Sequence, residues 1–176
     1  MRLFVAVAPP RHVVAALERV PRPEHPGVRW APPEQWHVTL RFLGEVADVG
    51  GVAAALGLVP GRLRGLGAGE PEAVVGPATA GFAGGRVLQV PVAGLDDLAE
   101  AASWAVSRWA PVSDHPFVGH ITVARARGSG RWPGLPGAGA PVAERFVVPG
   151  LALVASVLGA GGARHRVLHR VWLARP

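Results

Sequence analysis

The sequence predicts an α+β protein of two pseudo-symmetric lobes, each a mostly antiparallel sheet with helices packed outside, and an active-site cleft between the sheets. Each half of the chain contains an apolar strand, a helix, a proline-bearing loop and a strand with the pattern His-x-Thr. The spacing also agrees, because 35 positions separate Arg2 from His37 and 34 separate Arg86 from His120. This repetition indicates a diverged internal duplication, and 176 residues suffice for a single bilobal domain over 1–176.

The first half opens with an apolar run. Residues 2–7 end at Pro9-Pro10 and predict a buried strand. A short amphipathic helix should follow the prolines, because apolar residues recur there at helical spacing. Residues 21–33 are expected to form a proline-rich connector. The apolar positions of this helix are Val13, Val14, Leu17 and Val20.

The first His-x-Thr pattern lies in a segment of strict alternation. Residues 36–44 alternate apolar with polar side chains, which is typical of a strand with one solvated face. Asp48 is a candidate cap for a weak helix that contains glycine and extends to Leu58.

The second half repeats this order. Residues 72–82 and 86–92 predict two strands joined by a turn at Gly84-Gly85. Asp96 and Asp97 begin the helix with the clearest pattern in the chain. Its apolar positions are Leu98, Ala101, Ala102, Ala105, Val106 and Trp109.

The remaining segments alternate between loops and strands. A proline-containing loop over 111–116 leads into the strand 117–125, which carries the second His-x-Thr pattern. A glycine- and proline-rich tract over 128–141 is expected to be irregular. Three strands then close the chain over 142–148, 151–158 and 164–173, the last after a glycine turn over 159–162.

The composition excludes several kinds of chemistry. All 18 basic residues are Arg, and the chain has neither Lys nor Cys. The absence of Lys rules out a lysyl-adenylate, a Schiff base and a Lys-containing phosphate loop. The absence of Cys rules out a thiol nucleophile, a zinc-thiolate site and disulfides. The net charge of +6 favours an anionic partner, although a G- and C-rich genome would also enrich Arg.

The apolar runs are too short for the membrane. None approaches the roughly 20 residues that span a bilayer, and the first seven residues are too short for a secretory signal. We therefore expect a cytoplasmic protein with no membrane partner. We also expect it to act as a monomer.

The two His-x-Thr patterns are the most specific signal. With seven His and three Thr, composition alone would produce about 0.1 such triplets, whereas the chain has two. Side chains at i and i+2 of a strand share a face, so each imidazole should lie beside a hydroxyl. Two such pairs across a cleft would supply a base, an acid and two hydroxyl donors for in-line displacement at phosphorus.

These motifs carry a family resemblance. His37-Val38-Thr39-Leu40 and His120-Ile121-Thr122-Val123 resemble the signature tetrapeptides of the 2H phosphoesterase superfamily. More narrowly, the chain resembles the bacterial and archaeal RNA 2',3'-cyclic phosphodiesterases, also called 2'-5' RNA ligases. Supporting segments are residues 2–7, Val28-Arg29-Trp30, Phe42-Leu43-Gly44-Glu45, Arg125 and the glycine-rich residues 158–164.

The resemblance implies a metal-independent enzyme without a cofactor. Its partners would be RNA ends or nucleotides that bear a 2',3'-cyclic phosphate, opened to a 2'-phosphate. It implies that His37 and His120 are catalytic, with His37 as proton donor and His120 as acceptor, although the residues alone leave that assignment open. It also implies that Thr39, Thr122 and Arg125 bind substrate. The same chemistry permits the reverse, ATP-independent 2'-5' joining of a 5'-hydroxyl to a cyclic phosphate.

The chain departs from the family at two places. Ala155-Ser156 replaces a common Glu-Ser, and His165 replaces a common Tyr. Both changes lie outside the motifs, so they affect substrate contacts more than the chemistry.

The alternation of faces along the strand disagrees with a phosphate contact by Arg125. Simple alternation places it on the buried face, so a phosphate contact requires the strand to twist or end first. Arg41, which by alternation shares the face of His37 and Thr39, is the substitute candidate.

Other interpretations of the same residues remain open. A metal site would need three or four converging ligands, which neither motif supplies nearby. The cleft could belong to a non-catalytic RNA- or nucleotide-binding module, or to a cyclic phosphodiesterase of small nucleotides. Five histidines outside the motifs are expected to be solvated or locally paired: His12, His25, His115, His165 and His169. Aromatic residues that could stack a base, but are mostly expected in the core, are Phe4, Trp30, Trp36 and Phe117.

Overall fold

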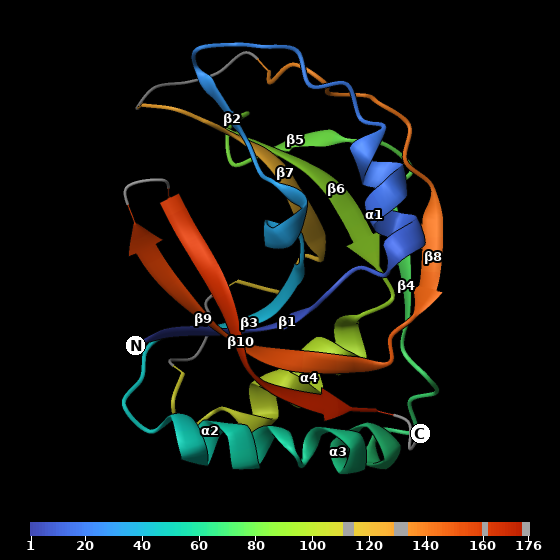
Figure 1. Ribbon diagram of the computed structural model, residues 1–176. Helices are drawn as coiled ribbons and strands as arrows, with labels where there is room; N and C mark the ends of the chain where they lie inside the picture. The colour runs from blue at the N-terminus through green and yellow to red at the C-terminus, as the bar shows by residue number, and fades with distance from the viewer. Residues whose placement is uncertain (111–114, 129–133, 160–161, 174–176) are drawn as a thin grey trace.

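The strands build one curved antiparallel sheet. The computed structural model describes residues 1–110, 115–128, 134–159 and 162–173. Its described strands follow the order β10-β9-β1-β3-β7-β6-β4-β8, with β2 added beside β7 and β5 beside β6 (Figure 1). The strands are β1 (Arg2–Val7), β2 (Val28–Trp30), β3 (Val38–Glu45), β4 (Glu72–Val75), β5 (Ala80–Phe82), β6 (Val87–Ala93), β7 (His120–Ala126), β8 (Glu144–Val147), β9 (Gly150–Gly159) and β10 (Gly162–Trp172).

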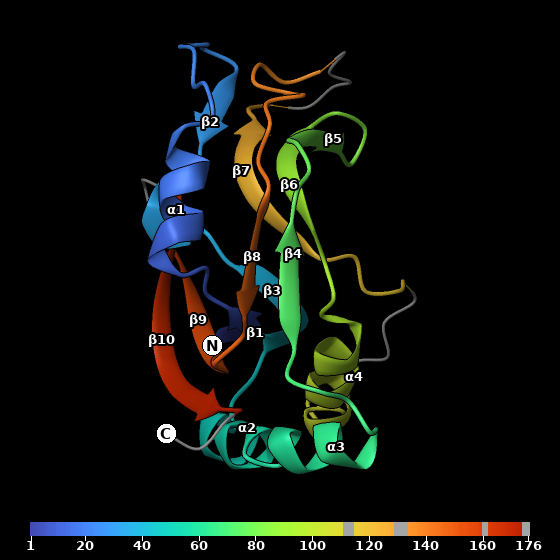
Figure 2. The same ribbon diagram turned by 90° about the vertical axis from the view of Figure 1, so that its right-hand side faces the viewer.

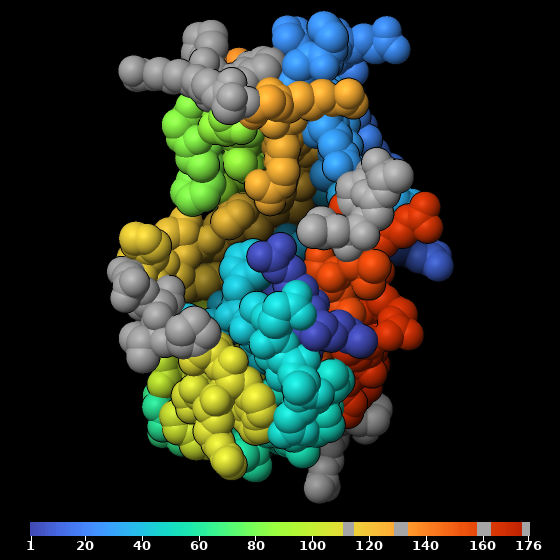
Figure 3. Space-filling view, turned by 90° about the vertical axis from the view of Figure 1, so that its left-hand side faces the viewer, coloured from blue at the N-terminus to red at the C-terminus, as the bar shows by residue number. Residues whose placement is uncertain are grey.

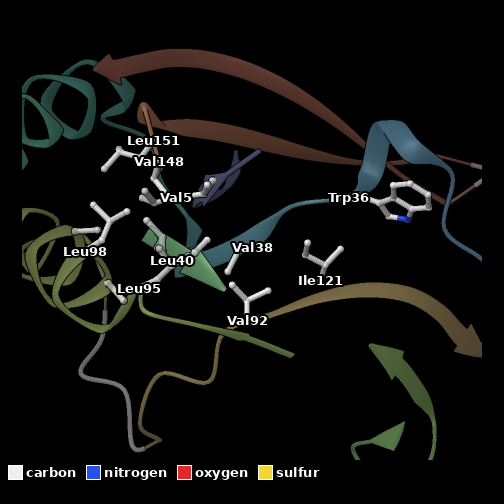
Figure 4. Close-up of a cluster of buried hydrophobic side chains, with 14 of the residues drawn as sticks. Val5, Trp36, Val38, Leu40, Val92, Leu95, Leu98, Ile121, Val148 and Leu151 are labelled. Carbon is white, nitrogen blue, oxygen red and sulfur yellow. The ribbon is translucent and has the colours of Figure 1, made fainter. Parts of the chain in front are cut away.

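The predicted pair of lobes is confirmed. One lobe contains β1, β3, β9 and β10, and the other contains β4, β6, β7 and β8. The two halves of the sheet meet where β3 pairs with β7, at Val38 opposite Ile121. Figure 4 shows these two side chains as neighbours, with Val92 close to them. Each is the middle residue of a His-x-Thr motif, so the seam places the two motifs next to each other.

The two halves of the chain exchange strands. β2 comes from the first half but pairs with β7 of the second lobe. β9 and β10 come from the end of the chain, yet β9 pairs with β1 of the first lobe. The sequence did not predict either exchange.

The described residues include four α-helices. α2, α3 and α4 lie together at one end of the molecule, while α1 lies beside β8 (Figure 1, Figure 2). α4 packs against β3, so the helix of the second half covers a strand of the first. The helices are α1 (Arg11–Glu18), α2 (Val49–Leu56), α3 (Val59–Gly65) and α4 (Asp96–Ala105), with a short 3-10 helix η1 (Pro33–Gln35). None of the described helices combines the length and apolar character needed to cross a bilayer.

Two predicted segments differ from the structure. The strand predicted over 72–82 is two strands, because Gly76 has a φ of +118° and Pro77 lacks the N–H that a ladder needs. The helix predicted over 48–58 ends at Leu56, and α3 follows it. Asp48 does cap α2, since its Oδ1 accepts a hydrogen bond from the Gly51 N–H at 2.8 Å.

The connector and the loops are the other differences. The proline-rich connector over 21–33 contains the strand β2. Parts of the loop over 111–116, the tract over 128–141 and the turn over 159–162 lie outside the described residues.

Candidate active site

All five residues that the sequence singled out line one cleft. The cleft has a volume of about 460 Å³, and His37, Thr39, His120, Thr122 and Arg125 are in its wall. In the space-filling view of Figure 3, the segments that line it lie on one face: the N-terminal residues in dark blue, β3 in cyan, β10 in red and β7 in gold. A volume of this size suits a nucleotide-sized ligand.

The two histidines are held in the same way. The Nδ1 atom of His37 lies 2.7 Å from the carbonyl oxygen of Gln35, and that of His120 lies 2.8 Å from the carbonyl oxygen of Val118. A carbonyl oxygen only accepts, so Nδ1–H is the donor in both rings. In the neutral tautomer Nε2 is therefore the free acceptor. Neither Nε2 has a hydrogen-bond partner among the described residues.

A bulge in β7 brings Arg125 into the cleft. Thr122 pairs with Gln89, whereas Ala124 pairs with the next residue, Leu88, so Val123 is an extra residue in the ladder. Val123 and Ala124 are both buried, and the alternation of faces is reversed after them. Arg125 then lies on the side of Thr122, and its Nη2 is 3.5 Å from the Thr122 hydroxyl.

A bulge in β3 corrects the second arginine assignment. Thr39 pairs with Ala6 and Arg41 with Val5, so Leu40 is the extra residue. Arg41 therefore shares the face of the buried Val5 and does not line the cleft, contrary to simple alternation.

Phe42 takes the cleft position that Arg41 leaves. It lines the cleft and is 69% exposed. Because Phe42 follows His37 by five residues and Arg125 follows His120 by five, the two side chains occupy equivalent places after their motifs. The duplicated half-sites therefore carry different chemistry, a cation in one and an aromatic ring in the other.

A phenylalanine supports each histidine ring. The Phe4 and His37 centroids lie 4.8 Å apart, and those of Phe82 and His120 lie 5.3 Å apart, each pair tilted by 33°. Phe4 is otherwise buried, as are the predicted core residue Trp36 and, in part, Trp30 and Phe117. Ring packing of this kind restricts how far each imidazole can rotate.

The charged groups of the cleft are all basic. Among the described residues that line it, the ionisable ones are Arg2, His37, His120, Arg125 and His165. Burial lowers the pKa of His37 from 6.5 to about 4, helped by the neighbouring His165, His120 and Arg125 and opposed by the Gln35 hydrogen bond. Burial also lowers the pKa of Arg125. An anion that binds in the cleft would stabilise the protonated forms of His37 and Arg125 and so raise their pKa values.

The sequence reasoning missed further contributors besides Phe42. Arg2 and Gln35 line the cleft, and so does His165, which was expected to be solvated or locally paired. Its ring lies 5.0 Å from that of His37 because β9 pairs with β1 and β10 pairs with β9. The replacement of a common Tyr by His165 was the one sequence signal at this position.

Within the described residues, no group of three or more His, Asp or Glu side chains could hold a metal ion. The third threonine, Thr79, lies outside the cleft, where its hydroxyl donates to the Gly137 carbonyl and accepts from the Ala140 N–H.

Comparison with known proteins identifies the family. Residues 5–71 match the family model described as LigT like phosphoesterase. A curated relative from Thermus thermophilus, named RNA 2',3'-cyclic phosphodiesterase, is 34% identical over 97% of this chain and 89% of its own.

Solved structures give the same result. The crystal structure of TT0787 from Thermus thermophilus superposes with a TM-score of 0.79 at 29% identity, covering 98% of both chains. E. coli LigT in apo form has a TM-score of 0.71 at 26% identity, covering 99% of this chain and 98% of its own. The sequence relative and the shared fold lead to one conclusion: the chain belongs to the family of LigT-like phosphoesterases.

Proposed function

We propose that this protein hydrolyses terminal 2',3'-cyclic phosphates of RNA to 2'-phosphates. The observation that carries the proposal is the pairing of two His-Thr motifs in one wholly basic cleft. Each motif presents an imidazole whose Nδ1 is fixed by a backbone carbonyl, which leaves Nε2 for proton transfer. The curated relative carries the name of this activity.

The reaction needs one proton acceptor and one proton donor. A water molecule attacks phosphorus and loses a proton to the neutral Nε2 of one histidine. The bond from phosphorus to the 3'-oxygen breaks, and the second histidine gives that oxygen a proton. The 2'-oxygen remains bonded to phosphorus, so the product is a 2'-phosphate with a free 3'-hydroxyl. The hydroxyls of Thr39 and Thr122 and the Arg125 guanidinium bind the non-bridging oxygens.

We assign the donor to His37 and the acceptor to His120. With a pKa of about 4, His37 is neutral in the free protein at pH 7, so it must gain its proton as the substrate binds. The negative charge of the cyclic phosphate favours that uptake, because an anion in contact with the His37 ring stabilises its protonated form and offsets the neighbouring basic groups.

The difference between the half-sites orients the substrate. Arg125 attracts the phosphate charge to the side of His120, where it pairs with the oxygens that remain on phosphorus. Phe42 offers a ring face on the side of His37, where a nucleobase can stack. The 3'-oxygen then leaves beside His37, in agreement with its role as donor.

The first experiment measures hydrolysis of an oligonucleotide that ends in a 2',3'-cyclic phosphate, with and without EDTA. We expect full activity in EDTA and its loss in both His37→Ala and His120→Ala, with His169→Ala as the matched control on an exposed strand position. Activity that depends on an added metal ion would overturn the mechanism. Oligonucleotide binding without hydrolysis at any pH would instead favour a binding module.

The second experiment separates donor from acceptor. A substrate with sulfur in place of the bridging 3'-oxygen has a leaving group that needs no proton. His37→Ala should regain most of its lost activity on this substrate, whereas His120→Ala should not. Rescue of His120→Ala alone would reverse the assignment.

The substrate size is tested by comparing oligonucleotides with mononucleoside cyclic phosphates. The cleft volume accommodates about one nucleotide, and E. coli LigT has been crystallised with 3'-AMP and with ATP. We propose RNA ends as the first candidate substrate and small cyclic nucleotides as the second. Equal kcat/KM on both kinds of substrate would favour the second. Joining of a 5'-hydroxyl end by the reverse reaction should need no ATP.

A further inference from the structure

His165 lies against the motif histidine His37. Its ring is 5.0 Å from His37 at 78° and 5.1 Å from Phe4 at 72°, so it meets both rings edge-on. It reaches this place from β10, opposite Ser156 of β9, and both residues line the cleft. The Gln35 side chain ties η1 to the same strand, because its Nε2 donates to the Ala163 carbonyl at 2.7 Å.

The ring of His165 is available to a ligand. It is only partly buried, and neither ring nitrogen has a hydrogen-bond partner in the described part of the chain. His165 therefore keeps both nitrogens for a ligand in the cleft, unlike His37 and His120, which each use one nitrogen on the backbone.

The groups that face His165 are basic or neutral. His37 precedes β3, Arg2 lies on β1, Ser156 lies on β9 and Gln35 lies on η1. Across the cleft, β7 contributes His120 and Arg125. The carboxylates on these elements do not line the cleft: Glu34 of η1 is exposed, and Glu45 of β3 is paired with the N-terminal amine at 2.9 Å.

We propose that His165 is a third imidazole of the anion site, which takes up a proton when a phosphate group binds and adds its charge to that of Arg125. The ligand class is a tetrahedral oxyanion, here the phosphate of the substrate or product. The inference deepens the proposed function and rests on it for the identity of that phosphate.

Two electrostatic effects follow from the geometry. Burial lowers the pKa of His165, so the ring tends to be neutral in the empty cleft at pH 7. A positive charge on His165 also disfavours a proton on His37, since the rings are in contact. A bound anion removes both obstacles, so anion binding and proton uptake are linked, and each must strengthen the other.

The test uses sulfate, which keeps its charge between pH 5.5 and 8. Calorimetric titration over this range gives the slope of log Kd against pH, which counts the protons taken up with the anion. In His165→Phe the ring still packs on His37, but the slope should fall by up to one proton. We expect sulfate affinity to drop about 10-fold at pH 5.5 and to change less than about 2-fold at pH 8, as for loss of one hydrogen bond to a charged group.

Two further variants serve as controls. His169→Phe makes the same change on the same strand at an exposed position and should leave the slope unchanged. His165→Tyr keeps a ring and a hydroxyl donor but has no proton to gain in this pH range, so it should also lower the slope. Histidine NMR on the wild type should show the His165 midpoint moving to higher pH when sulfate is added.

Three results would overturn the proposal. These are an unchanged slope in His165→Phe, an equal loss of affinity at every pH, and a wild-type cleft that takes no sulfate. The proposed function can fail separately. If the protein shows the His165-dependent slope but opens no cyclic phosphate, the proposed activity is refuted and the proposed contact between His165 and the anion still stands.

Discussion

The low pKa of His37 makes the stability of the free protein depend on pH. The unfolded chain binds a proton at His37 below pH 6.5, whereas the folded protein does so only near pH 4. Between these values the unfolded state holds more protons, so acidification destabilises the fold. A difference of this size corresponds to about 3 kcal/mol, a large part of the 5–15 kcal/mol that is typical of a domain.

The perturbation that isolates this effect is His37→Gln, which removes the titration and keeps a polar side chain. Urea denaturation, followed by tryptophan fluorescence at pH 7.5, 6, 5 and 4, gives the free energy of unfolding for both proteins. From pH 7.5 to 4 the wild type should lose about 3 kcal/mol more than the variant.

Two controls accompany this measurement. His169→Gln changes an exposed histidine and should follow the wild type. Sulfate should reduce the loss in the wild type, because an anion in the cleft favours the protonated ring. Parallel curves for wild type and His37→Gln would refute the argument that burial excludes the proton.

The other predictions concern turnover. Thr39→Val and Thr122→Val should each lower kcat by roughly 10- to 1,000-fold in steady-state assays, with losses equal within about tenfold. Thr79→Val should lower the melting temperature, because it breaks buried hydrogen bonds, and should leave the kcat of the folded fraction unchanged. A kcat loss as large as that of Thr39→Val would contradict the assignment of the Thr39 and Thr122 hydroxyls to phosphate binding. Arg125→Lys should reduce kcat/KM, because an ammonium cannot form the bidentate contact, and equal activity would exclude that contact. Phe42→Ala should raise KM for a nucleoside cyclic phosphate more than for a ribose cyclic phosphate without a base, and equal effects would exclude stacking. A plot of kcat/KM against pH should be bell-shaped, and a steady rise from pH 5 to 9 would contradict a coupled pair of histidines.

The sequence predicted the motif strands well because their pattern is local. Alternation and the repeated His-x-Thr spacing are properties of a few neighbouring residues, and both motifs do line one cleft. The roles of these residues stay predictions, as do the monomeric state and the cytoplasmic location.

Non-local pairing was not predictable in the same way. The faces of Arg41 and Phe42 depend on an extra residue in β3, which is defined only by its register with β1. His165 enters the cleft because the end of the chain pairs back onto its beginning. Neither the bulge nor the pairing leaves a periodic signature in a single segment.

The exchange of strands between the halves sets the order in which the protein can assemble during synthesis. β1 ends at Val7 and is buried between β3 and β9, yet β9 begins only at Gly150, so the first lobe has an open edge until most of the chain has been made. β2 likewise has no partner strand until β7 has been synthesised. These pairings across the two halves favour folding of the chain as one unit. Because each lobe is completed by a strand from the other half of the chain, the cleft with both motif histidines forms only when the two halves fold together.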